Sequence, residues 1–219
     1  FDPDGPIPPG AFEATGATPA TLAAVLDTQP FPLTIEGVGF EGLSGVRVNG
    51  EALGVLPPEF FVVNDSEVRV LLTTPLEVGL LDVELIKGGA VELVQVPVGV
   101  NETLTLDLLN SDPSFLISAA PVELYIGGPP GDIAALLLST SNQATSLPGI
   151  VDLALGNDGL SLIELGGFVI PPSGVVELIG SVGSPAPGTK LFFQAAWIQL
   201  AEPTFPLSVS NVESGTFIF

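Results

Sequence analysis

The chain has 219 residues, with 25 acidic side chains against 4 basic ones and a formal net charge of −21. It contains no cysteine, histidine or methionine, which excludes thiolate and imidazole zinc sites, Ser-His-Asp triads and disulfide bonds. Four basic residues cannot form the clusters that bind phosphate groups, so nucleic acid is not an expected partner.

Apolar residues are abundant: 46% of the chain is hydrophobic and 13% is charged, whereas soluble domains average about 25% charged residues. The longest purely apolar run, Ile133–Leu138, is far shorter than the roughly 18 residues of a membrane-spanning helix. We therefore expect no membrane span, and burial of the apolar excess in cores or between subunits. Because the chain begins at Phe1 without a methionine, we expect a processed product or fragment of a secreted, extracellular or cell-surface protein.

Glycine and proline divide the chain into short segments rich in Val, Leu, Ile, Thr and Phe. There are 26 glycines and 22 prolines, and amphipathic stretches of helical period are almost absent. This pattern predicts an all-β protein of two β-sandwich domains. We expect an extended Pro-rich arm over residues 1–16, a first domain over residues 17–99 and a second over residues 100–219.

The arm carries four prolines that favour polyproline II and exclude a central strand. They are Pro3, Pro6, Pro8 and Pro9. Two interpretations remain open: a terminus draped over the surface, or an arm that docks on a neighbouring subunit through Phe1 and Ile7.

Residues 17–99 contain seven predicted strands, several with strict alternation of apolar and polar residues. The strands are Leu22–Leu26, Leu33–Glu36, Val46–Asn49, Phe60–Val63, Val68–Leu72, Leu80–Ile86 and Val91–Val96. Gly37 and Gly39 are expected to allow a tight bend or bulge after a strand, and Phe40 to fill the core behind it.

Four blocks of this region match a known pattern in order and spacing. They are Leu33–Phe40, Val46–Gly50, Phe60–Val68, and Thr74-Pro75 with Gly79–Leu85. On these residues the region resembles the IPT/TIG family of immunoglobulin-like domains. The resemblance implies an immunoglobulin fold and an extracellular or regulatory binding module, with no catalytic residues to carry over.

Residues 100–219 contain a second series of predicted strands. They are Thr103–Leu108, Val122–Ile126, Ile133–Ser139, Val151–Leu155, Leu160–Leu165, Val175–Ser181, Leu191–Leu200, Leu207–Ser210 and Thr216–Phe219. Their number indicates a jelly-roll-like or immunoglobulin-like sandwich. Ile133–Ser139 can alternatively form a short helix capped by Asp132.

The same region resembles β-sandwich units at the C-terminus of secreted bacterial proteins. The resemblance lies in Gly128–Gly131, Leu191–Ala195 and Ser210-Asn211.

Calcium is the metal that this composition best suits, because hard cations take carboxylate and carbonyl oxygens from loops. The candidate ligands are Asp2, Asp4, Asp65, Glu67, Asn157 and Asp158. None of these stretches has EF-hand spacing, and the alternative interpretation is ordinary turn chemistry.

The sequence gives weaker indications of glycoside hydrolysis, sugar binding and glycosylation. Carboxylates such as Asp82 and Glu84 could form a glycosidase pair, but neighbours on one strand face usually serve solubility. Trp197, the single tryptophan, is either a sugar-stacking platform or a core residue. Asn64 and Asn101 begin Asn-x-Ser/Thr triplets and are potential glycosylation sites.

The chain ends on an apolar strand, so Phe217, Ile218 and Phe219 are candidate subunit contacts. We therefore expect a non-catalytic extracellular structural protein. It would be the subunit of a filament, surface layer or appendage, a homo-oligomer or polymer held by sandwich contacts and strand addition. The alternative is a carbohydrate- or ligand-binding adhesion module of a larger secreted protein.

Overall fold

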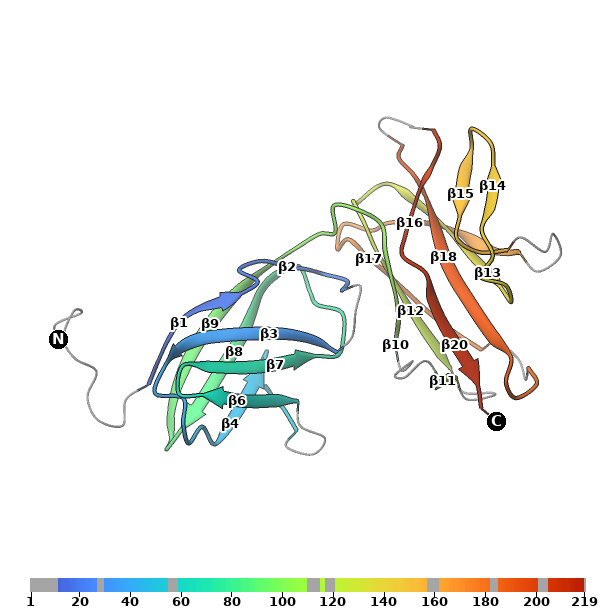
Figure 1. Ribbon diagram of the computed structural model, residues 1–219. Helices are drawn as coiled ribbons and strands as arrows, with labels where there is room; N and C mark the ends of the chain where they lie inside the picture. Colours follow the sequence, from blue (N-terminus) through green and yellow to red (C-terminus); the bar gives the residue numbers. More distant parts are fainter. Residues whose placement is uncertain are drawn as a thin grey trace. The chain divides into compact units, whose positions relative to one another are not determined.

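The computed structural model describes residues 12–26, 30–54, 59–109, 115–116, 121–156, 162–181, 185–200 and 205–218. Every regular element in these ranges is a β-strand (Figure 1), which confirms the predicted all-β class. Within the same ranges, no helix is long and apolar enough to cross a membrane.

The chain forms two compact units that interleave in sequence. Unit 1 comprises Phe1–Leu22 and Pro30–Gly99, and unit 2 comprises Ala23–Gln29 and Val100–Phe219. The segment Ala23–Gln29 thus belongs to unit 2, although both of its flanks belong to unit 1. The predicted first domain, residues 17–99, included this segment because neither its composition nor its period distinguishes it from the strands around it.

Unit 1 contains two sheets (Figure 1). The four-stranded sheet has the order β1 (Glu13–Thr18), β3 (Phe31–Val38), β7 (Glu67–Leu72), β6 (Phe60–Asn64). The five-stranded sheet has the order β2 (Leu22–Ala23), β9 (Ala90–Gly99), β8 (Gly79–Lys87), β4 (Gly45–Val48), β5 (Glu51–Ala52).

The core of unit 1 follows the predicted alternation. Leu33 and Ile35 of β3, and Val68 and Val70 of β7, are fully buried, while the residues between them face outward. Phe40 is also fully buried, as its position after the glycines predicted. The outer positions of the strands are therefore free to carry polar or interacting side chains.

Gly37 has a different role from the predicted bend, because it lies within β3. A Cβ at this position would overlap the carbonyl oxygen of Glu13 and stand 2.5 Å from the Phe40 ring. The absence of a side chain lets β1 approach β3 and lets Phe40 pack beneath them. The turn itself is at Gly39, whose φ of 77° favours glycine.

β1 corrects part of the predicted arm. Its residues pair antiparallel with β3, with Glu13 opposite Val38 and Thr18 opposite Thr34. Residues 13–16 are therefore strand and not irregular arm, because this stretch has no proline and Gly37 makes room for it. The remainder of the predicted arm, up to residue 11, lies outside the described residues.

Unit 2 also contains two main sheets and a small hairpin. The three-stranded sheet has the order β10 (Thr105–Leu109), β12 (Val122–Gly127), β17 (Val175–Gly180). The six-stranded sheet has the order β11 (Phe115–Leu116), β20 (Glu213–Phe217), β18 (Lys190–Ile198), β13 (Ile133–Ser139), β16 (Ile163–Val169), with β19 (Ser208–Val209) also on β18. β14 (Thr145–Leu147) pairs with β15 (Val151–Leu153).

A single apolar core joins the two main sheets of unit 2. Leu106 and Ile126 of the three-stranded sheet share a cluster with Leu136, Phe193 and Phe217 of the six-stranded sheet. This sandwich arrangement is the one that the strand pattern predicted.

The helical alternative for Ile133–Ser139 is wrong, because this segment is β13 and pairs with β16 and β18 on its two sides. Asp132 caps no helix. Its carboxylate accepts hydrogen bonds from Trp197 Nε1 and from the Leu200 backbone N–H, both at 3.0 Å. A six-residue apolar run is short enough to fill a central strand, which explains the ambiguity.

Two asparagines of unit 2 take the place of backbone in strand pairing. Asn101, 5% exposed, accepts from Val25 N at 2.9 Å and donates to Val25 O at 2.7 Å. Asn211 accepts from Leu106 N and donates to Leu106 O, both at 2.8 Å. Each carboxamide supplies the one donor and one acceptor that a residue of a neighbouring strand would supply. Through these two bonds Asn101 attaches the segment at Val25 to unit 2.

Candidate functional site

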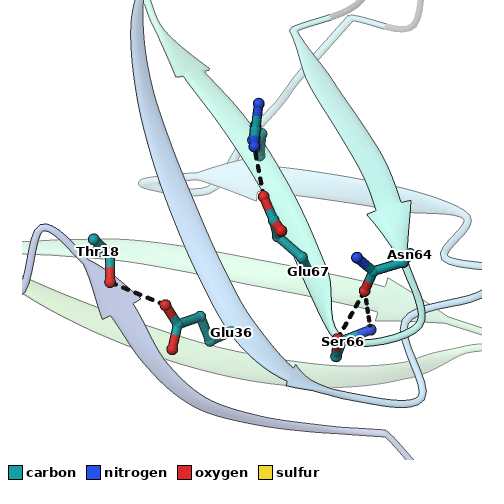
Figure 2. Close-up of polar contacts among 6 residues, drawn as sticks. Thr18, Glu36, Asn64, Ser66 and Glu67 are labelled. Atoms are coloured by element: carbon teal, nitrogen blue, oxygen red, sulfur yellow. Dashed lines mark hydrogen bonds and ion pairs between the residues drawn. The ribbon is translucent and has the colours of Figure 1, made fainter.

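The acidic turn between β6 and β7 contains two of the candidate calcium ligands, Asp65 and Glu67. Asn64 Oδ1 accepts from the backbone N–H and the hydroxyl of Ser66, both at 2.7 Å (Figure 2). Asp65 Oδ1 accepts from Glu41 N at 3.1 Å, and the Glu67 carboxylate is paired with Arg69 at 2.9 Å. The oxygens of this loop serve turn geometry and an ion pair, which is the alternative interpretation.

The other candidate calcium ligands, Asp2, Asp4, Asn157 and Asp158, lie outside the described residues. In the part of the chain that the structure describes, no group of three or more carboxylates is placed to hold a metal ion.

The predicted contact residues at the chain end have different environments. Phe217 is 1% exposed and belongs to the core of unit 2, so its side chain cannot reach a neighbouring subunit. Ile218 is partly buried, and its backbone N–H donates to Leu116 O at 3.1 Å. Phe1, Ile7 and Phe219 lie outside the described residues.

The two other candidate chemistries find little geometric support. Asp82 accepts from Gln95 Nε2 at 2.9 Å, and Glu84 is paired with Arg47 at 3.3 Å, so each carboxylate has its own partner on the sheet face. Trp197 is buried at 8% exposure, which makes it a core residue and not a platform on which a sugar could stack.

A polar hollow of about 570 Å³ lies on the outer face of the four-stranded sheet of unit 1. Its lining consists of Thr15, Thr18, Thr34, Glu36, Gly37, Ser66 and Glu67. The Thr18 hydroxyl donates to the Glu36 carboxylate at 3.1 Å (Figure 2). Glu36 and Glu67 are direct partners on β3 and β7, an arrangement of like charges that normally costs stability.

An apolar groove of about 340 Å³ opens in unit 2 between strands of its two sheets. It is lined by Val122, Leu124, Leu136, Leu138, Leu165, Phe168, Leu178, Ile179, Gly180, Ser181 and Phe193. β16 and β17 are the edge strands of their sheets, so the groove exposes core side chains between two sheet edges. Neither hollow was predicted, because each is assembled from strands far apart in sequence.

Asp107, Tyr125 and Glu177 lie side by side across the three-stranded sheet beside this groove, and we call them the acidic row; Asp107 is buried at 5% exposure. Asp107 is opposite Tyr125, and Tyr125 is opposite Glu177. The Tyr125 hydroxyl donates to Glu177 at 3.3 Å. Burial of Tyr125 raises its pKa, as do the charges of Glu177, Glu123 and Asp107, so three carboxylates act on one position of this sheet.

Asp107 should make the stability of unit 2 depend on pH. Burial raises the pKa of Asp107 from 3.8 to about 6, so folding disfavours its charged form and stability is lost as pH rises from about 4 through 6. Asp107→Asn cannot ionise and should be more stable than the parent by about 3 kcal/mol at pH 8, with a smaller difference at pH 5. Urea unfolding followed by Trp197 fluorescence measures both.

The control for this experiment is Asp152→Asn, which removes one charge from an exposed position of β15 in the same unit. It should change the unfolding free energy little at either pH. A stability difference for Asp107→Asn that is equal at pH 5 and pH 8 would contradict the prediction.

Comparisons with known proteins place the chain in no family. No protein-family model and no curated protein matches it, so the IPT/TIG resemblance stays a prediction.

The chain is similar to several solved structures at low sequence identity and low TM-score. Salmonella alpha-2-macroglobulin is 16% identical with a TM-score of 0.32, over 100% of this chain and 15% of that one. The chicken interferon gamma receptor alpha chain is 11% identical with a TM-score of 0.33, over 96% of this chain and 100% of that one. Bacteroides ovatus SGBP-B, solved with a mixed-linkage heptasaccharide, is 10% identical with a TM-score of 0.29, over 90% and 42%.

The chain thus spans about 15% of the length of the alpha-2-macroglobulin chain. Structural similarity at these TM-scores supports no conclusion about function. The assignment to two all-β sandwiches rests on the sheets and cores of the chain itself.

Proposed function

We propose that this chain is a non-catalytic structural protein of an extracellular assembly, whose subunits associate through the surfaces of their β-sandwiches. One observation carries the proposal: large apolar side chains are exposed on strands of both units. They are Phe61, Val62 and Val63 on β6; Leu80, Val91 and Leu93 on β8 and β9; Ile163, Leu165 and Val169 on β16; and Ile179 on β17.

The position of these residues matters more than their number, since single exposed apolar residues are normal. β6 is an edge strand of its sheet, and its exposed residues include no lysine or proline that would block pairing with another chain. Leu93 and Val91 stand on one outward face, Val91 beside Ile86 of β8. Leu93 stands opposite Glu84, so this face combines exposed apolar side chains with charged ones, as interfaces commonly do.

Sedimentation velocity over a range of protein concentrations tests the proposal. We expect concentration-dependent association that strengthens as salt is raised, because a net charge of −21 opposes contact and salt screens it. The double variant Val91→Gln, Leu93→Gln should weaken association by about thirtyfold, since each substitution loses roughly 1 kcal/mol of apolar burial.

The control is Val78→Gln, at a valine of comparable exposure in the loop before β8, which should leave association unchanged. A monomer that persists at every concentration and salt level would contradict the proposal.

Carbohydrate binding is the alternative function, and the polar hollow of unit 1 is the surface on which it would be expected. Its lining residues include hydroxyls and two carboxylates but no aromatic ring. Because sugar sites in proteins rely on stacking against rings, we do not extend the proposal to glycans.

A further inference from the structure

The two edge strands that border the apolar groove differ in how well they are protected. β16 has an irregular register opposite Leu136 and Leu137 of β13, and Gly166 in it has a φ of 150°. Such a bulge twists an edge away from further pairing. β17 runs in unbroken register with β12, from Val175 to Gly180, and contains neither proline nor lysine.

β17 therefore presents a regular strand edge on the side away from β12, where no strand of the described residues pairs with it. Its inward side chains, Val176 and Leu178, are partly buried against the core of unit 2. A strand added at this edge would place alternate side chains into the groove between Leu178 and Phe168. The occupant must be apolar at these alternate positions.

The other side chains of an added strand would lie on the outer face, beside Val175, Glu177 and Ile179 of β17. Glu177 is the charged residue among these three, and Glu123 of β12 lies on the same face, opposite Ile179. The only Lys or Arg of unit 2 is Lys190, which is on β18 in the other sheet. The positive charge that this face would favour has to come from the occupant.

We propose that β17 is a strand-addition site for an extended segment of another protein, with apolar residues at alternate positions and Lys or Arg between them. This inference rests on the proposed interaction function and names the partner of one surface. A second copy of the chain does not fit, because its four basic residues, Arg47, Arg69, Lys87 and Lys190, are on β4, β7, β8 and β18. Each of these strands already has a neighbour on both sides in its own sheet and cannot be added to another edge.

Synthetic peptides test the proposal with the full chain. The probe is a fluorescent nine-residue peptide of alternating valine and lysine; one control has the valines grouped together, and another has glutamate in place of lysine. We expect the alternating peptide to bind at least tenfold more tightly than either control, and binding to weaken as salt is raised. Hydrogen exchange should slow in β17 and not in β16.

A charge variant and its matched control locate the contact. Glu177→Gln should weaken binding of the valine–lysine peptide by about three- to fivefold, the value of one cross-strand charge pair. Glu164→Gln removes the same charge from an exposed position on β16 and should leave binding unchanged.

Three results would overturn the inference. The first is equal binding of the alternating and grouped peptides, which indicates attraction by net charge alone. The second is an equal effect of Glu177→Gln and Glu164→Gln. The third is that no peptide binds and that Ile179→Gln abolishes self-association. This result would mean that a second copy of the chain occupies the edge of β17. Self-association strengthens with salt and peptide binding weakens with it, so failure here is distinguishable from failure of the proposed function.

Discussion

Alanine in place of Gly37 is expected to lower the free energy of unfolding of unit 1 by about 3 kcal/mol. The added Cβ would overlap the carbonyl oxygen of Glu13 and stand 2.5 Å from the Phe40 ring and 2.9 Å from Cα of Ala14. Two of these neighbours are backbone atoms of β1, which cannot move without separating β1 from β3. The third is a ring buried in the core.

The matched control is Gly16→Ala, also within the β1–β3 pair, where a Cβ meets no atom within 4 Å. It should be neutral or slightly stabilising, because alanine restricts the unfolded chain. Far-UV circular dichroism must follow the unfolding, since the single tryptophan and tyrosine are both outside unit 1. Equal stability of the Gly37 and Gly16 variants would show that β1 does not depend on close approach to β3.

Asn101→Ala should cost about 4 kcal/mol of the stability of unit 2. Asn101 satisfies both the backbone N–H and the carbonyl of Val25, and Val25 is 1% exposed. The substitution leaves both groups buried without these partners, and each such loss costs about 1 to 3 kcal/mol. Urea unfolding followed by Trp197 fluorescence reports the change, because Trp197 is in the core of unit 2.

Asn142→Ala serves as the control, since Asn142 is exposed in the same unit and should change stability by less than about 0.5 kcal/mol. A loss for Asn101→Ala no larger than the control would mean that water replaces the carboxamide. The burial of Asn101 also bears on its Asn-x-Thr triplet, because a side chain at 5% exposure is inaccessible to glycosylation in the folded chain.

The strands that could be predicted from sequence are those with local signals. β7 and β8 alternate apolar and polar residues, and their buried positions, such as Val68 and Val83, follow that alternation. β1 lacks this alternation, because Glu13–Thr18 consists mostly of small and polar residues. It forms a strand because Gly37, which is distant in sequence, leaves space for it beside β3. β5, β11 and β14 have two or three residues each, too few for a period to appear.

The candidate site was less predictable than the fold, because its determinants are long-range. The sequence Asn64–Glu67 is compatible with a metal loop or with a turn, and the bonds that Asn64 makes to Ser66 and Glu67 makes to Arg69 are visible only in the folded chain. The groove beside β17 depends on strand order across two sheets. One local signal was available: Val175–Ile179 is apolar on both faces apart from Glu177, which is unusual for an exposed edge.

The interleaving of the two units has a practical consequence for cutting the chain. Cleavage of the peptide bond after Gly99 would not yield a complete unit 2. Val25, whose backbone is hydrogen-bonded to Asn101, would remain on the N-terminal fragment. The two fragments should co-purify without a covalent link. A recombinant C-terminal half that starts at Val100 would lack the Val25 backbone groups that Asn101 hydrogen-bonds, so no single cut in the sequence separates the two units.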